Sequence, residues 1–104
     1  MFTIKVCGIT RAVDIKNLIK SGVNALGFIL TKSPRQISLK KAEKLVKNVP
    51  PFIAAVAVTV NPDIKRLNQI INSHIFDYIQ FHGEEKIELS LFYLWGLVPH
   101  FLYT

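Results

Sequence analysis

Cysteine is nearly absent from this sequence, because Cys7 is its only cysteine. An internal disulfide needs two cysteines, and one cysteine with His74, His82 and His100 fits no standard zinc-ligand spacing. Disulfides accumulate in oxidising compartments, and the apolar run in MFTIKVCG is too short for the hydrophobic region of a signal peptide. We therefore expect a cytoplasmic protein that binds no metal.

Acidic residues are also few, with seven Asp and Glu against thirteen Lys and Arg, which gives a net charge of +6. Residues 1–50 carry ten basic and two acidic residues (+8), whereas residues 51–104 carry three basic and five acidic residues (−2). The lysines at 40–47 alternate with apolar residues, as on the exposed flank of a helix, and no aromatic residue lies among them. Because nucleic-acid platforms combine positive charge with aromatic stacking, we expect no nucleic-acid partner.

Charged residues are missing altogether from the C-terminal segment 89–104, LSLFYLWGLVPHFLYT. Its 16 residues fall short of the roughly 20 that span a bilayer, and Gly96 and Pro99 interrupt it, so we expect no membrane anchor. Two alternatives stay open for this segment. It packs against the open edge of a sheet, or it is foreign to the fold.

Short apolar runs alternate with segments of helical spacing along the rest of the chain. Gly22 is expected to end the first helix, Ser38 to cap the second, and Asn61 to cap the third with Pro62 at its first position. Strands are predicted at residues 2–6, 24–30, 52–60 and 77–81, and helices at 14–21, 38–49, from 61, and from 84.

This βα alternation, with strands that are apolar on both faces, predicts an α/β fold in which helices cover a parallel sheet. Two architectures are compatible with the pattern: a small open doubly wound sheet, or half of a (β/α)8 barrel. A complete barrel needs about 200 residues or more, and this chain has 104.

Polar residues gather where the predicted strands end. Cys7 ends the first strand, Arg35 follows the second in TKSPRQ, and Gln80 and His82 lie at the end of the fourth. Taken alone, a single cysteine is more often a small buried residue than a reactive one. However, ligands bind at the carboxyl ends of parallel strands, where a thiol beside a helix N-terminus can act as a base and an arginine can grip a carboxylate or phosphate.

Four stretches of the sequence resemble, in order, the phosphoribosylanthranilate isomerase family of tryptophan biosynthesis. They are KVCGIT, ALGFILTKSPRQIS, VAVTVN and IQFHGEE, and the resemblance covers about residues 2–90. It implies the first four β/α units of a (β/α)8 TIM barrel, that is, a truncated half-barrel with a parallel sheet. It also implies an isomerase that converts N-(5-phosphoribosyl)anthranilate into the corresponding 1-deoxyribulose 5-phosphate by an Amadori rearrangement, without any cofactor.

The resemblance also implies roles for individual residues. Cys7 corresponds to the general base that removes the ribose C2 proton, Arg35 to an arginine that holds the anthranilate carboxylate, and Gln80 and His82 to residues lining the same pocket. The family's general-acid aspartate and its phosphate-binding loops have no counterpart here. The three aspartates of the sequence, Asp14, Asp63 and Asp77, occupy positions that do not correspond to the family's general acid. Residues 91–104 do not resemble the family's fifth strand, so we expect residues 1–90 to form the half-barrel and the isolated chain to have little or no activity.

Two hypotheses about the function of the chain therefore remain, one an enzyme and one a non-catalytic structural protein. One is an isomerase by descent that acts on a small phosphosugar-anthranilate substrate. The other is a non-catalytic half-barrel that forms a homo-oligomer or pairs with a separate C-terminal half, because open strand edges and apolar faces favour association. A basic polyanion binder is a third reading that rests only on the charge of residues 1–50.

Overall fold

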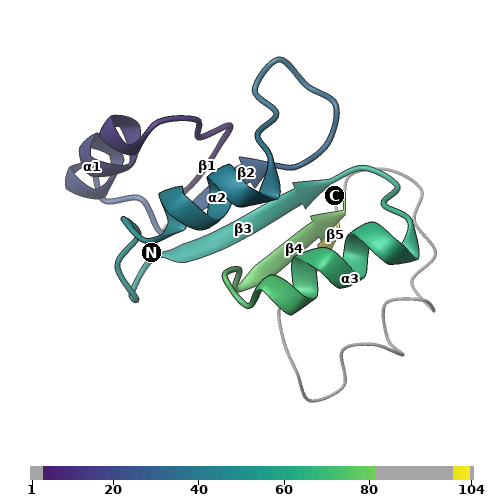
Figure 1. Ribbon diagram of the computed structural model, residues 1–104. Coiled ribbons are helices and arrows are strands. Elements are labelled where there is room, and N and C mark those ends of the chain that lie inside the picture. Colours follow the sequence, from purple (N-terminus) through teal and green to yellow (C-terminus); the bar gives the residue numbers. More distant parts are fainter. Residues whose placement is uncertain (1–3, 82–99, 104) are drawn as a thin grey trace.

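The computed structural model describes residues 4–81 and 100–103. Five strands form one parallel sheet, in which neighbours in space are also neighbours in the chain (Figure 1). The elements are β1 (Lys5–Cys7), α1 (Ala12–Lys20), β2 (Ala25–Ile29), α2 (Leu39–Val46), β3 (Ala54–Thr59), α3 (Ile64–Ser73), β4 (Tyr78–Phe81) and β5 (His100–Tyr103). The predicted α/β fold with a parallel sheet is thus confirmed, while the helix predicted from residue 84 lies outside the described residues.

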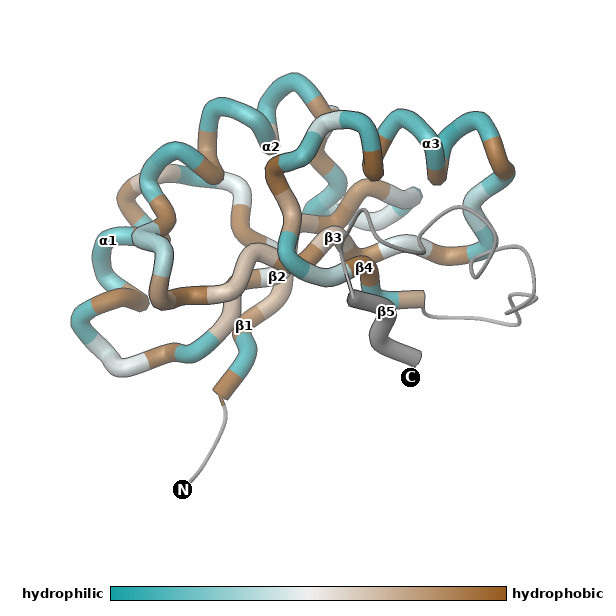
Figure 2. The backbone as a smooth tube through the Cα atoms, turned by 90° about the horizontal axis from the view of Figure 1, so that it is seen from below, coloured by the Kyte–Doolittle hydropathy of each residue, from teal (hydrophilic) through white to brown (hydrophobic). Residues whose placement is uncertain are grey.

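All three helices lie on the same side of the sheet (Figure 2). A doubly wound sheet reverses its strand order at a switch point and carries helices on both faces, whereas a barrel keeps the strand order and places its helices outside. The strand order and the helix placement therefore favour the half-barrel of our two alternatives.

The hydrophobic core lies between the sheet and these helices. Because side chains alternate along a strand, every second residue faces the helices. Leu26 and Phe28 of β2 are fully buried there, and Ile15 of α1 and Leu45 of α2 belong to the same cluster. The alternate residues of each strand face the opposite side of the sheet, which the described helices leave uncovered (Figure 2). Cys7 of β1 is one of these residues, because it is in register with Gly27 of β2, which lies between Leu26 and Phe28.

Helix boundaries follow local capping chemistry. The Ser38 hydroxyl accepts a hydrogen bond from the Lys41 amide at 3.1 Å, as predicted for an N-cap. Gly22, at φ +84°, follows α1 and donates its amide to the Ile19 carbonyl at 3.2 Å, so it ends that helix as expected.

The predicted cap of the third helix was wrong. Asp63, not Asn61, caps α3, and its carboxylate accepts from the Arg66 amide at 2.7 Å. Asn61 instead adopts a left-handed conformation at φ +43°, in the turn that leads from β3 toward the helix. A carboxylate is also favoured at a helix N-terminus by the helix dipole, so Asp63 competes successfully with the preceding Asn-Pro pair.

The C-terminal segment supplies a strand that we did not predict. Residues 100–103 pair in parallel with β4, with Tyr78 opposite His100 and Phe81 opposite Tyr103. This is the first of our two alternatives, packing against the open edge of the sheet. The physical reason is that an edge strand carries unpaired backbone groups, which another strand satisfies.

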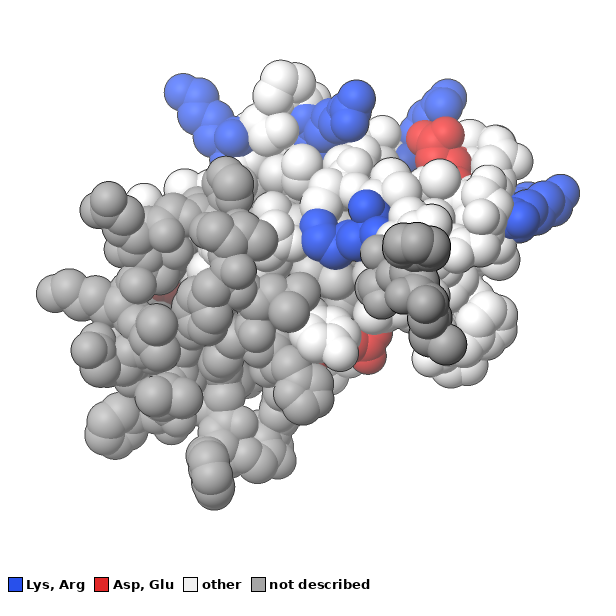
Figure 3. All heavy atoms as spheres, turned by 180° about the vertical axis from the view of Figure 1, so that it is seen from behind, with Lys and Arg blue, Asp and Glu red and all other residues white. Residues whose placement is uncertain are grey.

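Charge is dispersed over the described surface on the face that Figure 3 shows. Figure 3, seen from behind, shows Lys and Arg side chains separated by uncharged surface, with acidic side chains between some of them. This distribution fits solvated lysines better than a continuous nucleic-acid platform. That the protein has no nucleic-acid partner stays a prediction. Within residues 4–81 and 100–103, no helix has both the length and the apolar character that crossing a bilayer requires.

Candidate active site

The end of β1 presents Cys7 at the rim of the sheet. The chain turns immediately after it: Gly8 adopts φ +91°, and the Gly8 and Ile9 amides both donate to the Gly27 carbonyl, at 3.0 and 3.2 Å. Such a φ value is readily adopted only by glycine. Cys7 is a free, half-buried thiol on the sheet face away from the helices, so it is not part of the hydrophobic core.

Gly27 makes room for this thiol. It is the register partner of Cys7 on β2, and a methyl group at Gly27 would lie 2.7 Å from Cys7 Sγ and 3.2 Å from Cys7 Cα. Sequence reasoning did not single out Gly27. A glycine in the middle of the apolar strand ALGFI was the available signal, because an interior strand glycine often marks a close approach.

Arg35 is brought beside Cys7 by the loop after β2. The Ile37 amide donates to the Ile29 carbonyl at 2.9 Å, which closes this loop onto the end of the strand. The Arg35 side chain then runs over Gly8, since a methyl group at Gly8 would lie 2.7 Å from Arg35 Cδ and 3.1 Å from Nη1. Gly27 thus provides space for Cys7 and Gly8 provides space for Arg35, the two side chains predicted from the sequence.

Cys7, Gly8 and Arg35 line a cavity of about 400 Å³, which the start of α1 completes with Arg11 and Asp14. Arg11 and Asp14 form an ion pair at 3.0 Å, and the hydrogen bond and charge of Asp14 raise the pKa of the already exposed Arg11. This is the only salt bridge among the described residues. The guanidinium of Arg35 therefore has no carboxylate partner in that part of the chain and is available to an anionic ligand.

Lys5 is a second neighbour of Cys7 that sequence reasoning missed. It lies two residues earlier on β1, hence on the same face, and its Nζ donates a hydrogen bond to Cys7 Sγ. The signal was the spacing in KVC, because residues i and i+2 of a strand share a face. The thiol thus contacts the ammonium group of Lys5, and Arg35 lies over the next residue, Gly8.

Gln80 faces the same side of the sheet as Cys7 but does not line the cavity. It pairs in register with Val58, and the Thr59 hydroxyl donates to the Gln80 carbonyl at 3.1 Å. Gln80 is only 7% exposed, and its Oε1 atom has no hydrogen-bond partner among residues 4–81 and 100–103. An unpaired buried amide oxygen is costly, so it can accept a hydrogen bond from a ligand. His82, the remaining predicted site residue, lies outside the described residues.

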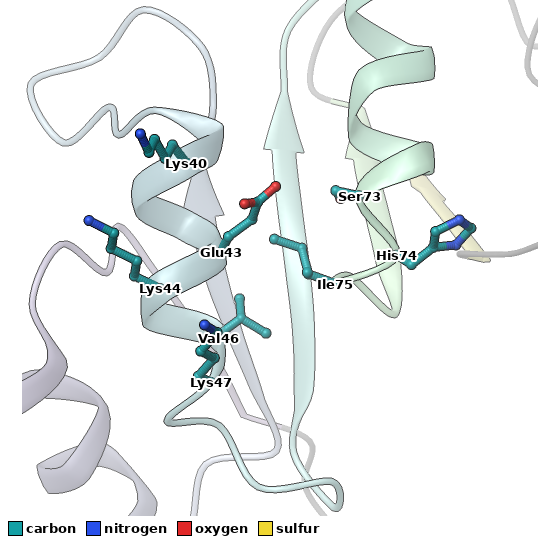
Figure 4. Close-up of a pocket in the computed structure, with 8 residues that line it drawn as sticks. All are labelled: Lys40, Glu43, Lys44, Val46, Lys47, Ser73, His74 and Ile75. Carbon is teal, nitrogen blue, oxygen red and sulfur yellow. The ribbon is translucent and has the colours of Figure 1, made fainter.

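A larger hollow of about 630 Å³ lies between α2 and the end of α3. Figure 4 shows that Lys40 and Lys44 point to one side of α2, whereas His74 points away from them beyond α3. The lysines of α2 and His74 therefore do not converge in this hollow, where Glu43 alone points across toward α3, and we assign no site to it. No group of three or more His, Cys, Asp or Glu side chains comes together in residues 4–81 and 100–103.

Comparisons with known proteins lead to one enzyme family. The family model for N-(5'-phosphoribosyl)anthranilate isomerase matches residues 4–99. A curated isomerase of that name from Petrotoga mobilis is 49% identical over 89 residues, which are 86% of this chain but 43% of the relative. This chain thus spans about half the length, or less, of the relatives it matches.

Solved structures lead to the same group. The phosphoribosyl anthranilate isomerase of Thermotoga maritima matches 99% of this chain and 50% of its own, with a TM-score of 0.88 and 32% identity. A structure of such an isomerase in complex with reduced 1-(o-carboxyphenylamino)-1-deoxyribulose 5-phosphate matches 88% of this chain and 47% of its own, with a TM-score of 0.81 and 36% identity. A third structure, of monomers generated from the dimeric Thermotoga maritima protein, also matches 88% of this chain and 47% of the isomerase chain, with a TM-score of 0.80 and 33% identity.

Proposed function

Because this chain belongs to the N-(5'-phosphoribosyl)anthranilate isomerase family, we propose that it carries the proton-abstracting part of that enzyme's active site. The reaction is the Amadori rearrangement of N-(5-phosphoribosyl)anthranilate to 1-(2-carboxyphenylamino)-1-deoxyribulose 5-phosphate. The observation that supports this proposal is the position of Cys7 and Arg35 in one cavity at the carboxyl ends of β1 and β2.

In this proposal Cys7, as the thiolate, accepts the C2 proton of the ring-opened imine. The electron pair of the broken C2–H bond forms a C1=C2 bond while the C1=N π electrons move to nitrogen, and a proton added at C1 converts this enolamine into the ketose. The exposed guanidinium of Arg35 holds the anthranilate carboxylate in bidentate fashion, and Gln80 and His82 contribute contacts to the substrate. All of these steps are proton transfers and polar contacts, which is why we propose no metal or organic cofactor. A thiol that must stay reduced also supports the cytoplasm as the location.

The acid that opens the ribose ring has to come from elsewhere. Asp14 is paired with Arg11, Asp63 caps α3, and Asp77 accepts from the Ala55 amide at 2.8 Å. Each aspartate of the chain is therefore engaged in a structural contact. Missing one positioned acid costs roughly 10²–10⁴ in rate, so we expect little or no turnover by the 104-residue chain alone.

We further propose that the chain works with a second polypeptide segment, either a C-terminal half or a second copy. No described strand pairs with the outer edge of β1, and the face carrying Cys7 is not covered by the described helices (Figure 2). Open parallel edges favour association, and half of a barrel leaves two of them. A purely structural half-barrel is the second candidate, and it predicts the same association without turnover.

The test is a turnover assay with the purified chain, alone and mixed with the C-terminal half of the Petrotoga mobilis relative. We expect no measurable rate alone, a rate on mixing, and loss of that rate with Cys7→Ser; Ser21→Ala, on the surface after α1, is the matched control. Size-exclusion chromatography with mass measurement reports the association. A rate near that of a full-length isomerase for the chain alone would contradict the proposed missing acid, and a stable but inactive mixture would favour the structural half-barrel.

A further inference from the structure

We propose that Lys5 is a positioning residue for Cys7, and that its ammonium group holds the thiol in the thiolate form that accepts a proton. The catalytic use of this contact rests on the proposed function. The state of the thiol does not, because it can be measured by chemistry on Cys7 itself.

The backbone leaves Lys5 few alternatives. Lys5 and Cys7 are both half-buried on the same face of β1, and Lys5 Nζ donates to Cys7 Sγ. Their register partners on β2 are Ala25 and Gly27, the two smallest amino acids. Since neither partner fills the space above the sheet, the long Lys5 side chain can lie along the strand and reach the sulfur.

The charges around Cys7 have the sign that a thiolate requires. Lys5 has no carboxylate within salt-bridge distance among the described residues, where Arg11 and Asp14 form the only ion pair. Arg35 approaches from the loop after β2, and the Arg11–Asp14 pair faces the same cavity from α1. The residues of β2 that face Cys7 carry no charge. Asp14 neutralises Arg11, whereas no acidic side chain among the described residues neutralises Lys5.

The Lys5 contact bears on the fraction of Cys7 that is thiolate at neutral pH. An unperturbed thiol titrates near pH 8.5, so only a few per cent of it is thiolate at pH 7. A neighbouring ammonium group favours the thiolate, and only the thiolate can accept the substrate proton. Removing the Lys5 ammonium should therefore lower the fraction of competent base at neutral pH without altering the sulfur's position at high pH.

The test measures the rate at which iodoacetamide alkylates the full 104-residue chain between pH 6 and 10.5. Because Cys7 is the only cysteine, every alkylation event reports this site, and the reagent is uncharged. We expect Lys5→Met to lower the rate at pH 7 by roughly threefold to tenfold and to move the rise of the rate with pH toward alkaline values. Above pH 10 the two rates should converge, and Lys5→Arg should restore most of the loss. Thiolate absorbance near 240 nm should follow the same pH profile.

Lys20→Met is the matched control, because Lys20 is an exposed lysine in the last turn of α1. Lys5→Gln serves as a second variant should Lys5→Met fail to give a folded circular dichroism spectrum. A pH profile identical to that of the unmodified chain, in either variant, overturns the inference. An equal loss of rate at pH 7 and pH 10.5 also overturns it, because that pattern reports changed access to the sulfur.

The outcome can be separated from that of the proposed function. If the profile shifts as expected but the mixture with a C-terminal half turns over no substrate, the role of Lys5 stands and the proposed function fails. If the mixture is active and the profile does not shift, the role of Lys5 alone is refuted.

Discussion

Alanine in place of Gly27 should disturb the stability of the sheet and the reactivity of Cys7 together. The added methyl group would lie 2.7 Å from Cys7 Sγ, about 1 Å inside the roughly 3.5–4.0 Å at which non-bonded atoms attract best. The sulfur alone cannot relieve this contact by rotating away, because the same methyl group lies 3.2 Å from the backbone Cα of Cys7. The β1 and β2 strands must therefore separate locally, or Cys7 must change its position.

The magnitude follows from two opposed contributions. Overpacking typically costs about 1–3 kcal/mol, whereas alanine in place of glycine at an ordinary backbone position gains roughly 0.5–1 kcal/mol of unfolding free energy. Gly27 has no positive φ, so the gain applies to it. We expect a net loss of about 1–2 kcal/mol, which lowers the urea midpoint by roughly 1–2 M at a slope of about 1 kcal/mol/M.

The assay is urea unfolding followed by circular dichroism, together with the alkylation rate of Cys7. Gly22→Ala is the matched control, because Gly22 has φ +84° and no atom within 4 Å of its would-be methyl group. It should lose about 1 kcal/mol through its backbone alone and leave Cys7 unchanged. A Gly27→Ala chain that is as stable as the unmodified one, with an unaltered alkylation rate, would refute the close approach of Gly27 and Cys7.

Three further substitutions test other contacts. Gly8→Ala should cost about 1 kcal/mol in urea through its φ of +91°, as Gly22→Ala does, and its methyl group, 2.7 Å from Arg35 Cδ, should displace this exposed side chain and weaken binding of a reduced substrate analogue in calorimetry; unchanged binding would mean that Arg35 does not lie over Gly8. Ser38→Ala should cost about 1 kcal/mol by the same assay, whereas Ser38→Asp keeps an N-cap acceptor and should retain the stability. Gln80→Leu should raise the unfolding free energy by about 1–2 kcal/mol, because it removes a buried oxygen that has no partner among the described residues, and should weaken binding of a reduced substrate analogue in calorimetry; lower stability would mean that the oxygen is paired.

The sequence pattern predicted where β1, β2, β3 and β4 lie, with errors of a few residues at their ends. The run FIAAVAVTV was expected to form a strand over residues 52–60, and β3 spans Ala54–Thr59. The error at Asn61 has a local cause: Asn-Pro and Asp63 both carry helix-start signals, and choosing between them requires the geometry of the turn. The strand at 100–103 could not be read from its residues, because what holds it is the free edge of β4, 19 or more residues earlier in the chain.

The candidate site shows the same division. Cys7 and Arg35 could be selected from the sequence, because strand ends in a parallel sheet converge and because their motifs resemble a known family. Gly27 and Lys5 were not selected, since their importance depends on which atom lies opposite Cys7 and on which face each side chain takes. Residue types and their order along the chain determine the fold class and the chemistry available to this protein. Whether that chemistry forms a site depends on register and on the space between neighbouring strands, which are distances between residues far apart in the chain and exist only once the sheet has formed.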